Sequence, residues 1–328
     1  MGCSASKLGT LDEPTVAATA VLQVSGIELS FDEVHDAVCD ELEAHPEVWV
    51  RESKEMGLVV ERFKALEGSV PMMHLIHGLA IEKLDRLPRS DELDDEGKPY
   101  WRTLEDLHAA WKPHPFENDP TREYKKLNVV FLSHRWSKPT LGLPDDDDNT
   151  KASIVVKQSK YGRDTYETDN WWWVDWVCAN QNNTAGHIAA LPLYIAASTE
   201  CFSVYIPGGD YDRRGWIRCE RALSASLNSP RSWKMIPPKV FAECTAKGEP
   251  PEKSEWWTLE DPFGGEATVE GDRIYLARLS ALALKMWPVG YACNWKGDNK
   301  YAEWGYQSEL VYGETKIYTW CMNYFAGI

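Results

Sequence analysis

The sequence predicts an α/β protein built on a parallel sheet, because short apolar runs alternate with helix-like segments in its middle third. The apolar runs lie at 127–132, 171–177, 201–206 and 233–236. Continuous apolar runs are typical of strands buried on both faces, and their alternation with helices indicates a parallel sheet. The connecting segments predict helices near 150–160, 187–197 and 211–226.

The segment before this sheet predicts a small helical unit. In residues 28–45 the apolar side chains recur at helical spacing, with Ser30 as a cap and Pro46 as the end. Similar spacing continues to residue 87, over 47–67 and 70–87.

Residues 88–126 are rich in Asp, Glu, Pro and aromatic residues, which predicts an extended acidic linker with one short helix near 103–111. Residues 238–328 predict a mixed loop, a helix near 272–286 and an irregular aromatic-rich extension that packs on the core. We therefore divide the chain into a tether (1–27), a helical segment with its linker (28–126), the α/β domain (127–237) and the extension (238–328).

Composition excludes several classes of protein. The 328 residues carry a formal net charge of −16, which argues against a nucleic-acid-binding face. No apolar run reaches the length of a membrane-spanning helix, and no secretory signal peptide is recognisable. The 8 cysteines form no C-x-x-C pair, so the sequence predicts no metal site and a reducing compartment.

The first residues match the N-myristoylation pattern. Gly2 follows Met1, and Ser6 stands at the required position. One myristoyl chain binds membranes only marginally, and Cys3 offers a palmitoylation site as the second signal. We therefore expect a lipid-anchored protein on the cytoplasmic face of a membrane.

Polar residues follow the ends of the predicted strands, where ligands bind in open parallel sheets. Ser133, His134, Arg135 and Trp136 follow the first strand, and Gly208 follows the third. Arginine grips phosphate or carboxylate, tryptophan stacks on rings, and glycine permits close backbone approach. Asp175, inside the second apolar run, is either a partnered core carboxylate or a site carboxylate.

Two further arrangements are candidates for chemistry. Trp216 and Glu220 are four residues apart on a predicted helix, so a carboxylate lies one turn from an indole. The alternative is a surface ion network between Glu220 and neighbouring arginines. A thiol hydrolase using Cys178 or Cys219 with His134 has no local signature, so inert buried cysteines are favoured.

The motifs resemble two related families. "VVFLSHRW" (129–136) is similar to the first strand and loop of TIR domains, and "GWIRCE" (215–220) resembles their Trp-Cys-x-x-Glu helix. "WWVDWVCANQ" (172–181) resembles a block of fungal heterokaryon-incompatibility domains. The resemblance implies a flavodoxin-like sheet, self-association, and cleavage of NAD at the nicotinamide–ribose bond with Glu220 as the catalytic residue.

The expected function is therefore a membrane-anchored, TIR-like signalling protein that hydrolyses NAD and needs no cofactor beyond this substrate. Residue chemistry assigns Arg135 to the pyrophosphate, and Trp136 or Trp216 to stacking on nicotinamide. The alternative is a non-catalytic, self-associating TIR/HET-like adaptor or a nucleotide-metabolite-binding module. Glu220 held at the strand ends favours the enzyme, whereas Glu220 in a surface arginine network favours the adaptor.

Overall fold

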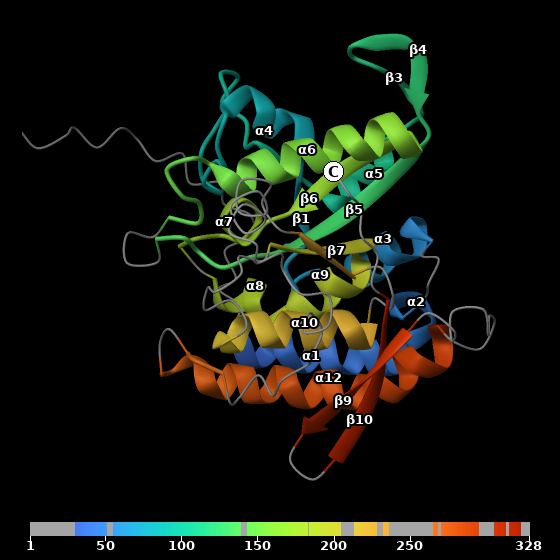
Figure 1. Cartoon of the computed structure of the whole chain (residues 1–328), viewed down its shortest axis with the longest axis vertical. Coiled ribbons are helices and arrows are strands. Elements are labelled where there is room, and N and C mark those ends of the chain that lie inside the picture. The colour runs from blue at the N-terminus through green and yellow to red at the C-terminus, as the bar shows by residue number, and fades with distance from the viewer. Residues whose placement is uncertain are drawn as a thin grey trace, which may run out of the picture.

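A mixed sheet with helices on both faces forms the centre of the molecule (Figure 1). The computed structural model describes residues 30–50, 55–138, 143–182, 184–204, 213–227, 232–235, 265–267, 270–294, 305–312 and 315–322. In spatial order the strands of this sheet are β2 (Trp101–Thr103), β1 (His74–His77), β6 (Thr168–Trp173), β5 (Lys126–Ser133), β7 (Glu200–Val204) and β8 (Ser232–Met235). The predicted α/β class is confirmed.

Four of these strands, β6, β5, β7 and β8, are parallel. β5 lies between β6 and β7, with Val130 opposite Trp172 and Phe131 opposite Cys201. Val130 and Phe131 are buried because helices cover both faces of this strand. The strands predicted from the four apolar runs are thus confirmed over the described residues, with β6 shifted at both ends; residues 205, 206 and 236 of the predicted runs lie outside the described residues. β6 ends at Trp173, and the rest of that run forms the short helix α7 (Asp175–Cys178).

Two antiparallel strands extend the sheet beyond β6, and they correct the prediction of a helix over 70–87. β1 pairs antiparallel with β6 through Ile76 and Trp172, and β2 pairs antiparallel with β1. Only the short helix α4 (Gly78–Leu84) follows. Leu75 and Ile76 are consecutive residues, and both are fully buried. Consecutive side chains of a strand point to opposite faces of the sheet, so a strand covered on both faces buries both of them. A search for helical periodicity does not detect this arrangement.

The expected linker over 88–126 is also wrong, because this segment is built into the fold. It supplies β2, the helix α5 (Leu104–Ala110) and a hairpin of β3 (His114–Phe116) and β4 (Asp119–Tyr124). The short helix predicted near 103–111 is confirmed. Its first turn is capped by Thr103, whose hydroxyl oxygen accepts a hydrogen bond from the Asp106 backbone N–H at 3.0 Å.

Helices cover the sheet in two unequal layers (Figure 1). α6 (Thr150–Tyr166) and α4 lie on one face, and α9 (Leu191–Ala197) and α10 (Gly215–Leu227) lie on the other. The predicted helix over 187–197 is two helices, α8 (Ala185–Ala189) and α9. They are separated at Ala190 because Pro192, near the start of α9, lacks the N–H that a continuous helix would need.

The first two N-terminal helices form an outer layer with α12 (Asp272–Asn294) (Figure 1). Ser30 caps α1 (Phe31–Ala44) as predicted, and Glu33 completes a capping box with it. α2 (Pro46–Trp49) and α3 (Met56–Ala65) follow. Phe31 stacks on Tyr275 of α12 with ring centroids 4.0 Å apart, so the first described helix packs against a helix from the C-terminal quarter of the chain.

One continuous hydrophobic cluster runs from Phe31 in α1 through the sheet to Met286 in α12. The C-terminal part also contains an antiparallel pair, β9 (Gly305–Tyr312) and β10 (Thr315–Met322). No helix within the described ranges is long and apolar enough to cross a membrane. The tether over 1–27, with Gly2 and Cys3, lies outside the described residues.

Candidate functional site

The carboxyl end of β5 brings together residues from three separate segments. Ser133 is the last residue of β5, and its hydroxyl donates a hydrogen bond to Glu220 Oε2 at 2.5 Å. Glu220 comes from α10, which packs on the sheet face beside β5. The half-buried Glu220 thus lies at the strand ends, one of the two places that the sequence allowed.

The environment of Glu220 favours its neutral form. Its pKa is raised to about 8, mainly by burial and also by the negative charge of Asp175, whereas the hydrogen bond from Ser133 opposes the rise. Glu220 is therefore largely protonated at neutral pH. The described contacts pair it with Ser133, not with the arginines that surround it in sequence.

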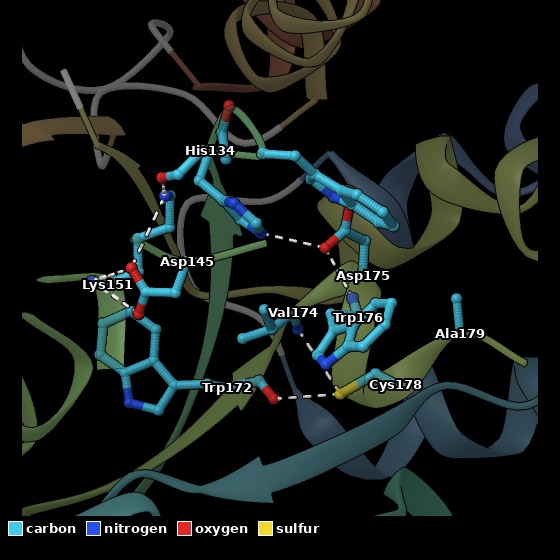
Figure 2. A network of polar contacts seen from close by, with 12 residues as sticks. His134, Asp145, Lys151, Trp172, Val174, Asp175, Trp176, Cys178 and Ala179 are labelled. Atoms are coloured by element: carbon cyan, nitrogen blue, oxygen red, sulfur yellow. Dashed lines mark hydrogen bonds and ion pairs between the residues drawn. The ribbon is translucent and has the colours of Figure 1, made fainter. Parts of the chain in front are cut away.

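His134 and Asp175 form a second pair at the same edge, and Figure 2 shows their side chains pointing toward one another. His134 Nε2 lies 3.0 Å from Asp175 Oδ1, and the imidazole is almost fully buried, with 1% of the side chain exposed. Asp175 also accepts hydrogen bonds from the Trp136 indole at 2.7 Å and from the Trp176 backbone at 2.6 Å.

Asp175 lies just past the end of β6, in the first turn of α7, where it is a partnered carboxylate at the carboxyl edge of the sheet. Burial alone would raise its pKa, but the hydrogen bonds that it accepts from His134, from the Trp136 indole and from the Trp176 backbone hold it below the ordinary value. This fixed anion orders the loop after β5. The Trp136 ring in turn meets the edge of the Trp176 ring at 5.3 Å between centroids.

A buried lysine supports the same loop from α6. Lys151 is 3% exposed, and its ammonium group contacts the Ser137 hydroxyl and lies 3.7 Å from Asp145 Oδ1 (Figure 2). Burial lowers its pKa, against the opposing charges of Asp145 and Asp146. The Asp145 carboxylate also accepts backbone N–H groups of Lys151 and Ala152, both at 2.9 Å, and so caps α6.

Lys151 and Asp145 are not among the residues that the sequence predicts for the site. The available signal was an acidic residue shortly before a helical segment, which is typical of a helix start. Nothing in the pattern showed that a lysine in the first turn would be buried.

The remaining predicted site residues do not all reach this edge. The Trp216 indole donates to Asp272 Oδ2 at 2.9 Å, so it is held by α12 rather than beside Ser133. Arg135 is half-buried and follows His134 directly. Gly208 lies outside the described residues.

The cysteines near the site are buried and weakly acidic. Burial raises the pKa of Cys178 to about 12, and its thiol donates to the Trp172 carbonyl at 3.5 Å (Figure 2). Burial also raises the pKa of Cys219 far above the ordinary value. A thiolate nucleophile is therefore not favoured at either position.

A second buried carboxylate lies at the opposite end of β6. Asp169 is 2% exposed and accepts hydrogen bonds from the Trp111 indole at 2.8 Å, from His77 at 2.8 Å and from His114 at 3.1 Å. These bonds lower its pKa to about 2, although burial opposes them. Asp169 thus ties α5, β1 and the β3–β4 hairpin to the sheet. No cluster of His, Cys, Asp or Glu with metal-binding geometry occurs within the described ranges.

Comparisons with known proteins identify no relative of this chain. A scan against family models, a search of curated proteins and a search of solved structures each return no match. The functional interpretation therefore depends on the two carboxylates at the β5 edge and on their partners.

Proposed function

We propose that the chain is a TIR-like signalling protein that cleaves NAD at the nicotinamide–ribose bond, with Glu220 as the catalytic carboxylate. The observation that carries the proposal is the 2.5 Å hydrogen bond that fixes Glu220 against Ser133 at the end of β5. A partly desolvated carboxylate in this place has the chemistry to stabilise an oxocarbenium-like transition state.

The order of the parallel strands supports the flavodoxin-like interpretation. Numbered along the chain from β5 to β8, the parallel strands lie in the spatial order 2-1-3-4. This is the order of the first four strands in flavodoxin-like sheets, where ligands bind at the switch point between the first and third strands. The corresponding strands here are β5 and β7, and α10, which follows β7, carries Glu220.

Because the pKa of Glu220 is raised, the positive charge of the substrate changes the protonation state of this carboxyl group. In the free protein the group is mainly protonated, because its pKa is about 8. The nicotinamide ring of NAD is cationic, so its arrival favours the ionised carboxylate and releases the proton. The carboxylate then faces the positive charge that develops on the ribose. We assign stacking on the nicotinamide to Trp136 and the pyrophosphate to Arg135.

The test is nicotinamide release from NAD by the purified protein, with and without a crowding agent that promotes assembly. Glu220→Gln keeps the shape of the side chain and removes its charge, so we expect a loss of roughly 100-fold or more. Glu61→Gln makes the same change at an exposed position on α3 and should leave the rate unchanged.

Equal release by wild type and Glu220→Gln would keep the activity and remove Glu220 from the site. Absence of release under both conditions would favour the self-associating adaptor or nucleotide-binding module.

We further propose that Gly2 and Cys3 carry acyl chains that hold the protein on the cytoplasmic face of a membrane, where it self-associates through the TIR-like domain. Gly2→Ala should move the protein from the membrane to the soluble fraction, because no myristoyl chain can then be attached. Cys3→Ser should give weaker, reversible binding, since one acyl chain remains. Membrane retention of the Gly2→Ala protein would contradict the anchor.

A further inference from the structure

The buried imidazole of His134 has one nitrogen committed and one nitrogen without a protein partner. Nε2 is held by Asp175 at 3.0 Å. Nδ1 is buried and makes no hydrogen bond within the described part of the chain. Leaving a buried polar atom without a partner is unfavourable, so an unpaired nitrogen at a candidate site points to a ligand or a catalytic role.

The hydrogen bond to Asp175 decides which nitrogen carries the proton. The ionised Asp175 accepts only, so His134 Nε2 must donate. In the neutral ring this leaves a lone pair on Nδ1, and a second proton there would create a buried N–H donor without an acceptor. Asp175 is itself held by Trp136 and Trp176, so the ring orientation is fixed. A histidine oriented by a carboxylate on one nitrogen, with a lone pair on the other, is the arrangement of a general base.

We propose that His134 is the general base that activates the attacking water in the cleavage reaction, and that Asp175 is its positioning residue. This inference rests on the proposed function, and it separates two roles that the sequence did not distinguish. Glu220 stabilises charge on the ribose, and His134 accepts the proton of the nucleophile. The backbone joins the two functions directly, because Ser133, which holds Glu220, precedes His134 in the chain.

The proposed cleavage conserves atoms, electrons and charge. The bond between the ribose C1′ and the nicotinamide nitrogen breaks, and its electron pair leaves with neutral nicotinamide. The oxygen of water forms the new bond to C1′, and the proton of that water goes to His134 Nδ1. The resulting imidazolium keeps its Nε2–H on Asp175, and it later releases the proton to solvent. The products are nicotinamide, ADP-ribose and one proton.

The near-complete burial of the ring adds a feature to this role. With 1% of its side chain exposed, His134 keeps Nδ1 away from bulk solvent, so the attacking water of this proposal is an enclosed one. An enclosed, oriented water reaches the short-lived oxocarbenium centre before competing nucleophiles do.

The decisive variant is His134→Gln. The glutamine amide keeps a donor for Asp175 at the place of Nε2 but supplies no basic nitrogen at the place of Nδ1. We expect kcat for nicotinamide release to fall about 10²–10⁴-fold, with KM changed by less than a few-fold and the thermal midpoint close to wild type. His108→Gln makes the same change at an exposed position on α5 and should keep full activity.

The rates of wild type, Glu220→Gln and His134→Gln distinguish a failure of His134 as the base from a failure of the proposed NAD cleavage. If wild type releases nicotinamide, Glu220→Gln does not, and His134→Gln keeps a rate within a few-fold of wild type, the function stands and the base is not His134. If wild type releases no nicotinamide, the inference is tested by which nitrogen of the His134 ring carries the proton.

Nitrogen NMR of histidine-labelled protein, assigned by comparison with His134→Gln, should then show the proton of the neutral His134 ring on Nε2 and not on Nδ1. A protonated Nδ1 would overturn the inference whether or not the protein is an enzyme. A lost thermal transition in His134→Gln would make this spectroscopic measurement the deciding one.

Discussion

At the scale of single residues, the two carboxylates of the site are held in opposite protonation states. Glu220 is neutral because burial and the charge of Asp175 raise its pKa to about 8, whereas His134 and two tryptophans keep Asp175 ionised. Titratable groups whose pKa values are pushed apart are a recurring feature of acid–base sites. The structure thus holds one carboxyl group at this edge mainly neutral and the other ionised at neutral pH.

The raised pKa of Glu220 makes stability depend on pH. Its pKa is 4.5 ordinarily and about 8 in the folded protein, so the folded state binds this proton more tightly than the unfolded state. The contribution is fully present below pH 4.5 and is lost as the pH rises toward 8, by roughly 3–5 kcal/mol. Glu220→Gln should therefore become more stable relative to wild type over this interval, as measured by urea unfolding at several pH values.

The matched control for this measurement is Glu61→Gln, on the exposed face of α3. Its difference from wild type should stay constant with pH. Parallel stability curves for wild type and Glu220→Gln would show that Glu220 ionises normally in the folded protein.

The ionisation of Asp169 changes the stability of the protein with pH in the opposite direction. Its pKa falls from 3.8 to about 2 in the folded protein, so it stabilises the fold above pH 3.8, and that contribution is lost as the pH falls toward 2. The shift corresponds to about 2.5 kcal/mol. Asp169→Asn should be less stable than wild type at pH 6 in urea unfolding, and the difference should shrink in acid. A difference that does not change with pH would exclude an ionic role.

At the scale of elements, periodicity located the buried strands and the long helices but not the antiparallel edge. Strands β5 and β7 are continuous apolar runs, and α6 and α10 are long enough for a pattern to emerge. β1 is four residues long and runs directly into α4, so a helical reading fitted the same residues. The site was only partly foreseen for the same reason. Ser133, His134 and Glu220 follow recognisable elements, whereas Lys151 depends on the path of the acidic loop.

The crossing of α4 over α6 depends on a glycine. A Cβ added at Gly78 would lie 1.8 Å from Ser159 Oγ and 2.8 Å from the Trp172 indole nitrogen. The Trp172 indole donates to that same hydroxyl at 2.8 Å. Gly78→Ala should therefore destabilise the protein by about 1–3 kcal/mol through overpacking, measured as a lower midpoint in thermal unfolding.

Gly57→Ala in α3 is the control, because its nearest neighbour would be His108 at 3.8 Å, an ordinary contact. That change should be neutral or stabilising by up to about 1 kcal/mol, since alanine favours the helix. A Gly78→Ala protein as stable as Gly57→Ala would mean that α4 can shift away from α6 without cost.

At the scale of the whole molecule, the segments that the sequence separated share one interior. The sheet takes β1 and β2 from the N-terminal segment, and the hydrophobic cluster continues into α12. The boundaries of the resemblance, 127–237, therefore enclose the site but not all the elements that complete its sheet. The sequence similarity is limited to the segment that contains the motifs, whereas the packed core includes every segment that buries apolar area, so their boundaries differ.

We expect a fragment of residues 127–237 not to fold alone. Without β1, the backbone of β6 would lack its antiparallel partner, and an open apolar edge favours aggregation. The fragment should show no cooperative thermal transition in circular dichroism, whereas the full chain should show one. A cooperative transition in the fragment would establish 127–237 as an independent domain.

The antiparallel edge also has a consequence for synthesis on the ribosome. His77 at the end of β1 meets Asp169 at the start of β6, 92 positions later in the chain. The first strand to emerge must wait until its partner has left the exit tunnel, with Leu75 and Ile76 uncovered in the meantime. Such distant pairing slows folding and prolongs exposure. The nascent chain should therefore depend on chaperones most strongly between the appearance of β1 and that of β6.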